Sequence, residues 1–94
     1  MPEILFDIRW PDGTAEQCYS PSRVIREHLT VGATYDVSEF LHRSRTALTI
    51  ASDRVREKYG FACSRAIGQL ARLEAAARRF DNASGSVTVT SFHE

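Results

Sequence analysis

RWPDGTAEQCYS, residues 9–20, predicts a β-hairpin by its composition. Before the turn, apolar residues alternate with polar ones, the period of two that indicates a strand with one buried face. These apolar residues are Ile4, Phe6, Ile8 and Trp10. Pro11, Asp12 and Gly13 have the backbone preferences of a tight turn, so residues 14–19 should return as a second, antiparallel strand.

A short helix and a loop are expected after the hairpin. Ser20 followed by Pro21 is the pattern of an N-cap residue with proline at the first helical position, where the missing N–H group is harmless. We therefore predict a helix over residues 21–29. Residues 30–34 contain a glycine and no periodicity, which indicates a loop.

A long helix is predicted next in the chain. Asp36 and Glu39 have the spacing of a capping box, and Tyr35 and Phe40 flank them at the spacing of a hydrophobic staple. From there an apolar stripe at steps of three and four continues to Tyr59. Its members are Val37, Phe40, Leu41, Ser44, Leu48, Ala51, Val55 and Tyr59.

A chain reversal and a second long helix should follow. Gly60 suits the left-handed position that ends a helix, and Phe61 would supply the apolar contact that often accompanies such an end. Cys63 or Ser64 is expected to cap a helix that runs to about Phe80. Its inward face would consist of Ala66, Ile67, Leu70, Leu73, Ala77 and Phe80. The alanines permit close approach of the two helices, so we expect an antiparallel pair.

The last segments complete the fold class. Residues 81–85 are expected to form a loop, and the β-branched run over residues 86–92 predicts a strand. The order β-β-α-α-α-β predicts an α+β fold, in which a small antiparallel three-stranded sheet packs against a short helix and a long antiparallel helix pair. The first strand is the most apolar and should lie in the centre of that sheet. The length predicts one domain over residues 1–94.

Charge and hydropathy argue against two classes of partner. Twelve basic residues balance twelve acidic ones, and Arg72, Arg78 and Arg79 offer only a thin basic stripe, so nucleic acid is not expected. No apolar run approaches the roughly 20 residues of a membrane helix. Because MPEILFDIRW also lacks the features of a signal peptide, we predict a cytoplasmic protein without a membrane partner.

The two cysteines, Cys18 and Cys63, are expected to be free thiols in a reducing compartment. Together with His28 and His42 they could be assembled into a metal site on paper. Structural zinc sites, however, usually present paired ligands two to four residues apart, and these residues form no such pair. The sequence therefore predicts no metal site, and it contains no signature that would indicate a cofactor.

Three long blocks of sequence carry a family resemblance: RWPDG (9–13), CYSPS (18–22) and LTIASDRVREKYGFACS (48–64). With these blocks the chain resembles a small bacterial family described as nitrogen-starvation-response proteins, and the similarity extends over nearly its whole length. The resemblance implies expression when nitrogen is scarce. It also implies a gene cluster with a nitrilase, a radical S-adenosylmethionine enzyme, an acetyltransferase-like protein and a flavoprotein. It implies no established activity and no catalytic residues.

One hypothesis for function is a small enzyme that uses Cys63 as an activated thiol on a pathway intermediate. A thiol at a helix N-terminus meets the positive end of the helix dipole, which favours the thiolate, and Arg65 lies nearby in the sequence. Such a nucleophile also needs a base, and His28, His42 and His93 all belong to other elements.

The hypothesis that we favour is a non-catalytic accessory protein that binds a small ligand or a partner. The residues predicted to make such contacts are Trp10, Cys18, Tyr19, Tyr35 and Arg65. Aromatic residues combine a large apolar area with a polar group, which suits them to binding. The partner could be an enzyme of the same gene cluster. The free edges of a small sheet also favour a homo-oligomer, with a dimer as the first expectation.

Overall fold

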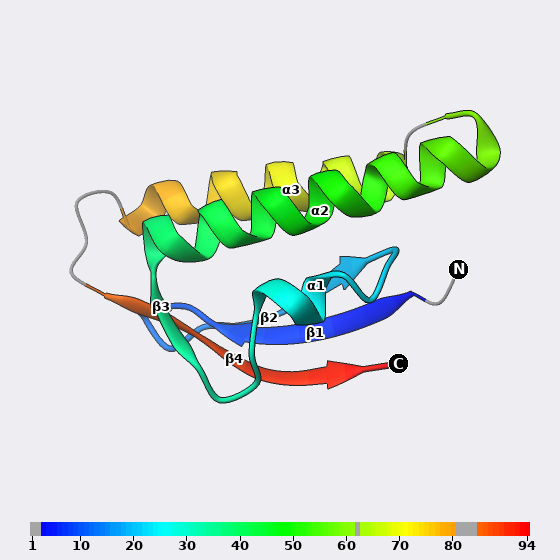
Figure 1. The fold of residues 1–94 in the computed structure, drawn as a ribbon. Helices are drawn as coiled ribbons and strands as arrows, with labels where there is room; N and C mark the ends of the chain where they lie inside the picture. Colours follow the sequence, from blue (N-terminus) through cyan, green and yellow to red (C-terminus); the bar gives the residue numbers. More distant parts are fainter. Residues whose placement is uncertain (1–2, 62, 81–84) are drawn as a thin grey trace.

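The computed structural model describes residues 3–61, 63–80 and 85–94. It has two layers, because the two long helices lie side by side across one face of a single sheet, and the opposite face carries no helix (Figure 1). A shorter helix lies near the long helices, at the side of the sheet. The predicted α+β class and the antiparallel helix pair are thus confirmed.

The sheet contains four antiparallel strands in the order β2-β1-β4-β3. β1 spans Ile4–Arg9, β2 spans Ala15–Ser20 and β4 spans Ser86–His93. The predicted hairpin and the central place of the first strand are confirmed, because β1 pairs with β2 on one side and with β4 on the other.

The prediction of three strands was wrong, because a fourth strand, β3, spans Thr34–Asp36. It pairs with residues 86–88 of β4. A strand of this length carries too few residues to display an alternating pattern, and its pairing partner lies about fifty residues further along the chain. Tertiary pairing, which the local sequence does not encode, therefore determines this strand.

The short helix α1 is smaller than predicted and spans only Ile25–His28. Its N-cap is Val24, so the expected cap at Ser20 was wrong. The Ser20 hydroxyl accepts a hydrogen bond from the Ser22 backbone N–H at 3.3 Å and donates to the Ser22 carbonyl at 2.7 Å. Serine side chains that bond nearby backbone groups in this way stabilise turns in competition with a helix.

The long helix α2 spans Val37–Tyr59, as predicted. Asp36 is its N-cap and accepts a hydrogen bond from the Glu39 backbone N–H at 2.7 Å. The helix ends at Gly60, whose φ of 84° is the left-handed conformation that favours glycine. Neither this helix nor any other in the described residues is long and apolar enough to cross a membrane.

The second long helix, α3, spans Ser64–Ala77 and continues as a single 3₁₀ turn, η1, over Arg78–Phe80. Cys63 occupies its N-cap position, although its side chain makes no capping hydrogen bond. α3 packs against α2 and also against β2. Most of the loop predicted over residues 81–85 lies outside the described residues.

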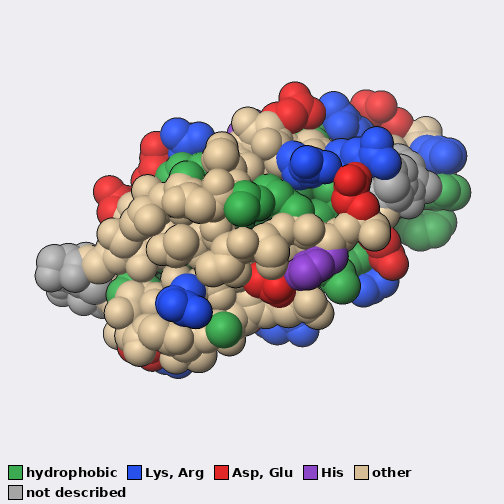
Figure 2. All heavy atoms as spheres, turned by 90° about the horizontal axis from the view of Figure 1, so that it is seen from below, with side chains coloured by type: hydrophobic (Ala, Val, Ile, Leu, Met, Phe, Trp, Pro, Cys, Tyr) green, Lys and Arg blue, Asp and Glu red, His purple; other side chains and the backbone are tan. Residues whose placement is uncertain are grey.

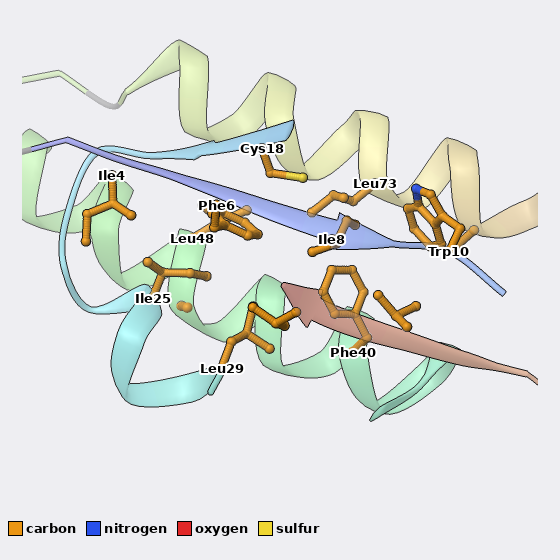
Figure 3. Close-up of a cluster of buried hydrophobic side chains, with 14 of the residues drawn as sticks. Ile4, Phe6, Ile8, Trp10, Cys18, Ile25, Leu29, Phe40, Leu48 and Leu73 are labelled. Atoms are coloured by element: carbon orange, nitrogen blue, oxygen red, sulfur yellow. The ribbon is translucent and has the colours of Figure 1, made fainter. Parts of the chain in front are cut away.

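The core lies between the sheet and the helices (Figure 3). The alternating residues of β1 all point into it and are at most 1% exposed: Ile4, Phe6, Ile8 and, just beyond the strand, Trp10. Trp10 stacks on Phe80 with ring centroids 5.5 Å apart and meets Phe40 edge to face at 5.8 Å. Burial of large aromatic side chains is a major source of folding free energy in so small a domain.

Three residues that were expected to pack inward are instead exposed at the chain-reversal end of the helix pair. Tyr59 is 52% exposed, Phe61 is 68% exposed and Ile67 is 56% exposed. The predictions for Tyr59 and Ile67 were wrong because helical periodicity gives a direction around the helix and not the extent of the layer beneath it. Phe61 was expected to make the apolar contact at the helix end and is also exposed. At this end the helices extend beyond the sheet (Figure 1).

The helix-free face of the sheet is mostly polar. Backbone and uncharged side chains make up much of it, with scattered charged groups (Figure 2). The two edge strands are β2 and β3. Helix α3 packs against β2, and β3 has only three residues, so each edge offers little free backbone to a partner strand. Free sheet edge is thus scarcer than the homodimer hypothesis assumed, and the homodimer stays a prediction.

Candidate functional site

The predicted binding residues lie in two different environments. Trp10 and Cys18 are each 1% exposed and point into the core, so neither presents a surface to a ligand (Figure 3). Burial also raises the pKa of the Cys18 thiol far above its usual value, which keeps it protonated. Their burial gives no support to the predicted binding role, and they are not part of the site proposed below. The indole Nε1–H of Trp10 donates to Glu16 Oε1 at 2.8 Å, a contact that stabilises the hairpin.

Tyr35 also has a structural role in the fold. Its hydroxyl accepts a hydrogen bond from the Thr30 backbone N–H at 3.0 Å, and its ring lies 5.0 Å from the Arg43 guanidinium. The Tyr35 side chain packs against the core from the edge. These contacts account for the tyrosine without a ligand.

Tyr19 and Arg65 are brought together by the fold, although 46 residues separate them in the sequence. The Arg65 guanidinium lies over the Tyr19 ring, 3.9 Å from its centroid. Both side chains line a shallow depression that is open to solvent, and Gly68 and Arg72 complete its lining. We call this surface the Tyr19–Arg65 depression.

Three of the four lining residues come from α3. Arg65 and Arg72 are seven residues apart, about two turns of helix, so they lie almost in line and about 10 Å apart along the axis. Gly68 lies between them on the same side of the helix. A Cβ atom added at Gly68 would have no atom within 4 Å, so no neighbouring group in the protein requires a glycine there.

Gln69 joins the depression to the sheet. Its side chain is 1% exposed, and its Oε1 accepts the Tyr19 backbone N–H at 2.9 Å and an Arg72 guanidinium N–H at 3.3 Å. The first bond satisfies a backbone donor on an edge strand, and the second holds the Arg72 side chain. Gln69 Nε2 has no hydrogen-bond partner among the described residues.

The Tyr19 phenol has a perturbed titration. Partial burial raises the pKa of Tyr19, the Cys63 thiol beside it raises it further, and the Arg65 guanidinium opposes both effects. The burial effect is the largest of these. The phenol therefore stays protonated at neutral pH, where it can act as a hydrogen-bond donor.

The Cys63 thiol lies beside Tyr19, but it has no base next to it in the described part of the chain. Its backbone N–H donates to Ser52 Oγ at 3.3 Å, and its side chain packs against the core. His28 and His42 line a separate depression near the start of α2, whereas Cys63 follows the end of that helix. The structure thus supplies no thiol–imidazole pair from the residues that it describes.

A second polar cluster, formed by Asp7, Ser91 and His93, lies on the helix-free face of the sheet. Asp7 Oδ2 accepts from the Ser91 hydroxyl at 2.7 Å and lies 2.8 Å from His93 Nε2. The hydrogen bonds to His93 and then to Ser91 lower the pKa of Asp7. In a serine–histidine–aspartate relay the acid and the hydroxyl contact opposite ring nitrogens, whereas here both contact Nε2. The cluster therefore lacks the geometry of that relay.

A metal-binding role finds no support in residues 3–61, 63–80 and 85–94, where no three His, Cys, Asp or Glu side chains gather as ligands would. The apolar groove between α2 and α3 is a further concave surface, lined in part by Leu48, Ala66 and Leu70. Leu48 and Ala66 belong to the buried core and Leu70 packs against it, so the fold accounts for these side chains. Of the three depressions named here, all within the described residues, the Tyr19–Arg65 depression combines predicted binding residues with charged groups.

Sequence reasoning missed Gly68 and Gln69 and treated Arg72 only as part of a basic stripe. A signal for Gln69 was present, because Ala66, Gln69 and Leu73 fall at helical spacing and a polar residue on an inward face needs a partner. Gly68 is also a signal, since a glycine within a helix is unfavourable. Their connection to Tyr19 depends on the packing of α3 against β2 and is visible only in the structure.

The comparisons with known proteins give one match. A family model described as nitrogen starvation-induced protein NitG matches residues 5–92. No curated protein and no solved structure matches the chain. The matched residues include all of the described secondary structure except Ile4 at the start of β1 and His93 at the end of β4, and they include every residue that lines the depression.

Proposed function

This chain belongs to the NitG family of nitrogen starvation-induced proteins, and from that premise we propose that it is a non-catalytic accessory protein that binds a small ligand. The binding surface is the Tyr19–Arg65 depression. The bound molecule is either a metabolite of the nitrogen-starvation response or a short segment of an enzyme encoded in the same gene cluster. In both cases the protein holds its ligand without transforming it.

The observation that carries this proposal is Gly68. A glycine in the interior of a helix costs about 1 kcal/mol relative to alanine, and Gly68 has neither a positive φ nor a close neighbour that would require it. A ligand that approaches the helix backbone between Arg65 and Arg72 would account for the residue. The partly exposed Tyr19 and the exposed guanidiniums around it would then supply the contacts.

The surroundings of Cys63 support the non-catalytic part of the proposal. Its neighbours are a phenol that stays protonated and a serine hydroxyl that already accepts a backbone hydrogen bond. Neither group is a general base at neutral pH. The alternative, a small enzyme that uses Cys63 as its nucleophile, stays a prediction that lacks a base among the described residues.

Native mass spectrometry of the tagged protein, purified from nitrogen-starved cells of its host, tests the proposal. The informative variant is Gly68→Leu, which fills the depression with a side chain that favours helix and whose Cβ meets no atom within 4 Å. The matched control is Ala71→Leu, which adds the same side chain at an exposed position of α3 that does not line the depression.

We expect the wild-type protein and the Ala71→Leu variant to retain the same bound molecule, and the Gly68→Leu variant to lose it. The same bound mass in all three proteins would contradict the proposal. So would a wild-type protein that carries nothing under starvation. Circular dichroism of the three proteins shows whether the fold is unchanged.

A further inference from the structure

We propose that the ligand of the Tyr19–Arg65 depression is a small molecule that carries an oxyanion group, either a carboxylate or a phosphate. This inference rests on the proposed function and deepens it by naming the chemical class of the ligand. It depends on three features of the depression: how its guanidiniums are held, which charges surround them, and how closely a ligand can approach the helix.

Both guanidiniums are held in position by contacts that leave donors free. The Arg65 guanidinium carbon lies over the Tyr19 ring, 3.9 Å from its centroid, and one Arg65 N–H lies 3.5 Å from Glu3 Oε2, so the side chain is held by two contacts that engage few of its donors. Arg72 is oriented by a single hydrogen bond, from Nη2 to Gln69 Oε1 at 3.3 Å. A guanidinium has five N–H donors, so both side chains keep donors for a ligand. Planar forks of this kind match the geometry of carboxylate and phosphate groups.

The charge of the depression is positive. Within the described residues Arg72 has no ion-pair partner, and Arg65 meets only Glu3, at 3.5 Å with both side chains more than 60% exposed. An ion pair at that distance and exposure is weak. By contrast, the Arg45 guanidinium on the adjoining helix lies 2.6 Å from a Glu74 carboxylate oxygen. The arginines of the depression are therefore available to an incoming anion.

Gly68 permits an anion to lie between the two arginines. Because the space above its Cα is empty, a ligand oxygen can approach the helix more closely there than over any residue with a side chain. The protonated Tyr19 hydroxyl at the same surface would add a neutral donor. A cation would be repelled here, and an apolar ligand would leave these donors unpaired, so an oxyanion is the chemistry that fits.

Titration of the purified full chain followed by ¹⁵N NMR tests the inference. The probes are inorganic phosphate and succinate, each compared with sodium chloride at equal ionic strength, and the reporters are the backbone amides of Tyr19, Gly68 and Arg72. The test variant is Arg72→Gln. The matched control is Arg56→Gln, which removes the same charge from an exposed position on α2 that does not line the depression.

We expect phosphate or succinate to shift these amides saturably, and the one that binds more tightly identifies the phosphate or the carboxylate class. Arg72→Gln should weaken the affinity about tenfold or more, since a charge-assisted hydrogen bond is lost. Arg56→Gln should change it less than about threefold. Arg72→Lys, which keeps the charge but loses the fork, should fall between them.

The inference is overturned if both anions act only as sodium chloride does, or if Arg56→Gln weakens binding as much as Arg72→Gln. These results are separable from a failure of the proposed function. If Gly68→Leu still expels a bound molecule in native mass spectrometry while neither anion binds, the depression is a ligand site and the oxyanion class is wrong. If both experiments are negative, the site itself is wrong.

Discussion

The two sides of α3 differ in how completely the fold explains their residues. On the side that faces the sheet, Ala66, Gln69, Leu73 and Ala77 are each at most 5% exposed. On the other side Arg65, Gly68 and Arg72 are exposed, and their contacts within the protein are few. Folding therefore dictates the first set of residues and leaves the second set nearly free.

This difference indicates which side of α3 carries residues that serve a purpose other than folding. A residue that is costly to the fold and has no intramolecular reason is more informative than one that is simply exposed. Gly68 is such a residue, whereas Trp10, the most conspicuous residue in the sequence, is fully explained by its aromatic neighbours. Substitutions on the side that faces the sheet should therefore lower the stability of the protein. Substitutions on the exposed side should weaken ligand binding without such a loss of stability.

The largest effect is expected for Leu73→Ala, on the side that faces the sheet. Leu73 is 0% exposed, so its truncation should lower the free energy of unfolding by about 2–5 kcal/mol through lost burial and a residual cavity. Arg72→Ala, on the exposed side of the same helix, should change it by less than about 0.5 kcal/mol. Urea denaturation measures both. Equal losses of unfolding free energy in the two variants would show that both sides of α3 contribute equally to the stability of the fold.

A smaller loss, about 1–3 kcal/mol, is expected for Gln69→Leu. The substitution keeps an inward side chain of similar size but leaves the Tyr19 backbone N–H without the acceptor that it has at 2.9 Å. Hydrogen exchange at the Tyr19 amide should accelerate in this variant more than exchange elsewhere in β2. An unchanged exchange rate would mean that Gln69 only fills space and that its hydrogen bond does not protect the Tyr19 amide.

Much of this architecture could be predicted because local signals agreed with the tertiary structure. The alternation of β1, the turn at Gly13, the Asp36 cap and the left-handed Gly60 are each encoded within a few residues. The missed elements depend on distant partners. β3 exists because β4 pairs with it, and the helix expected from Pro21 is shortened by hydrogen bonds between serines and the backbone.

The candidate site was predictable in part. Tyr19 and Arg65 could be chosen for their side-chain chemistry, but their contact requires that α3 pack against β2, which no local pattern encodes. Trp10 and Cys18 were chosen on the same chemical grounds and proved to be core residues, because one face of a hairpin is buried and the other is not. Side-chain chemistry alone could not separate the buried residues, Trp10 and Cys18, from the accessible ones. Cys18 is buried and Tyr19 is partly exposed because neighbouring residues of β2 point to opposite faces of the sheet.

The exposed side of α3 should respond to Gly68→Ala with a gain in stability. The added methyl group meets no atom within 4 Å and improves helix propensity, so the free energy of unfolding should rise by about 0.5–1 kcal/mol. Thermal denaturation measures this gain. In the same variant ligand affinity should fall, since the approach to the helix is narrowed. A loss of stability would show that the glycine serves the fold, and the central observation behind the binding site would then fail.

The smallest effect concerns the titration of the Tyr19 phenol on β2, which contacts the exposed side of α3 through Arg65. Because its pKa is raised in the folded state, the protonated phenol favours folding below the unfolded pKa of about 10, and this contribution is lost as the pH rises through the folded pKa. Ultraviolet difference titration against Tyr19→Phe should give a midpoint for Tyr19 above about 10, the value of an unperturbed tyrosine. Cys63→Ser should lower the midpoint, because the thiol contributes to the rise. A Tyr19 midpoint below about 10 would mean that the Arg65 guanidinium outweighs burial. The depression would then be more solvated and more strongly cationic than its packing indicates.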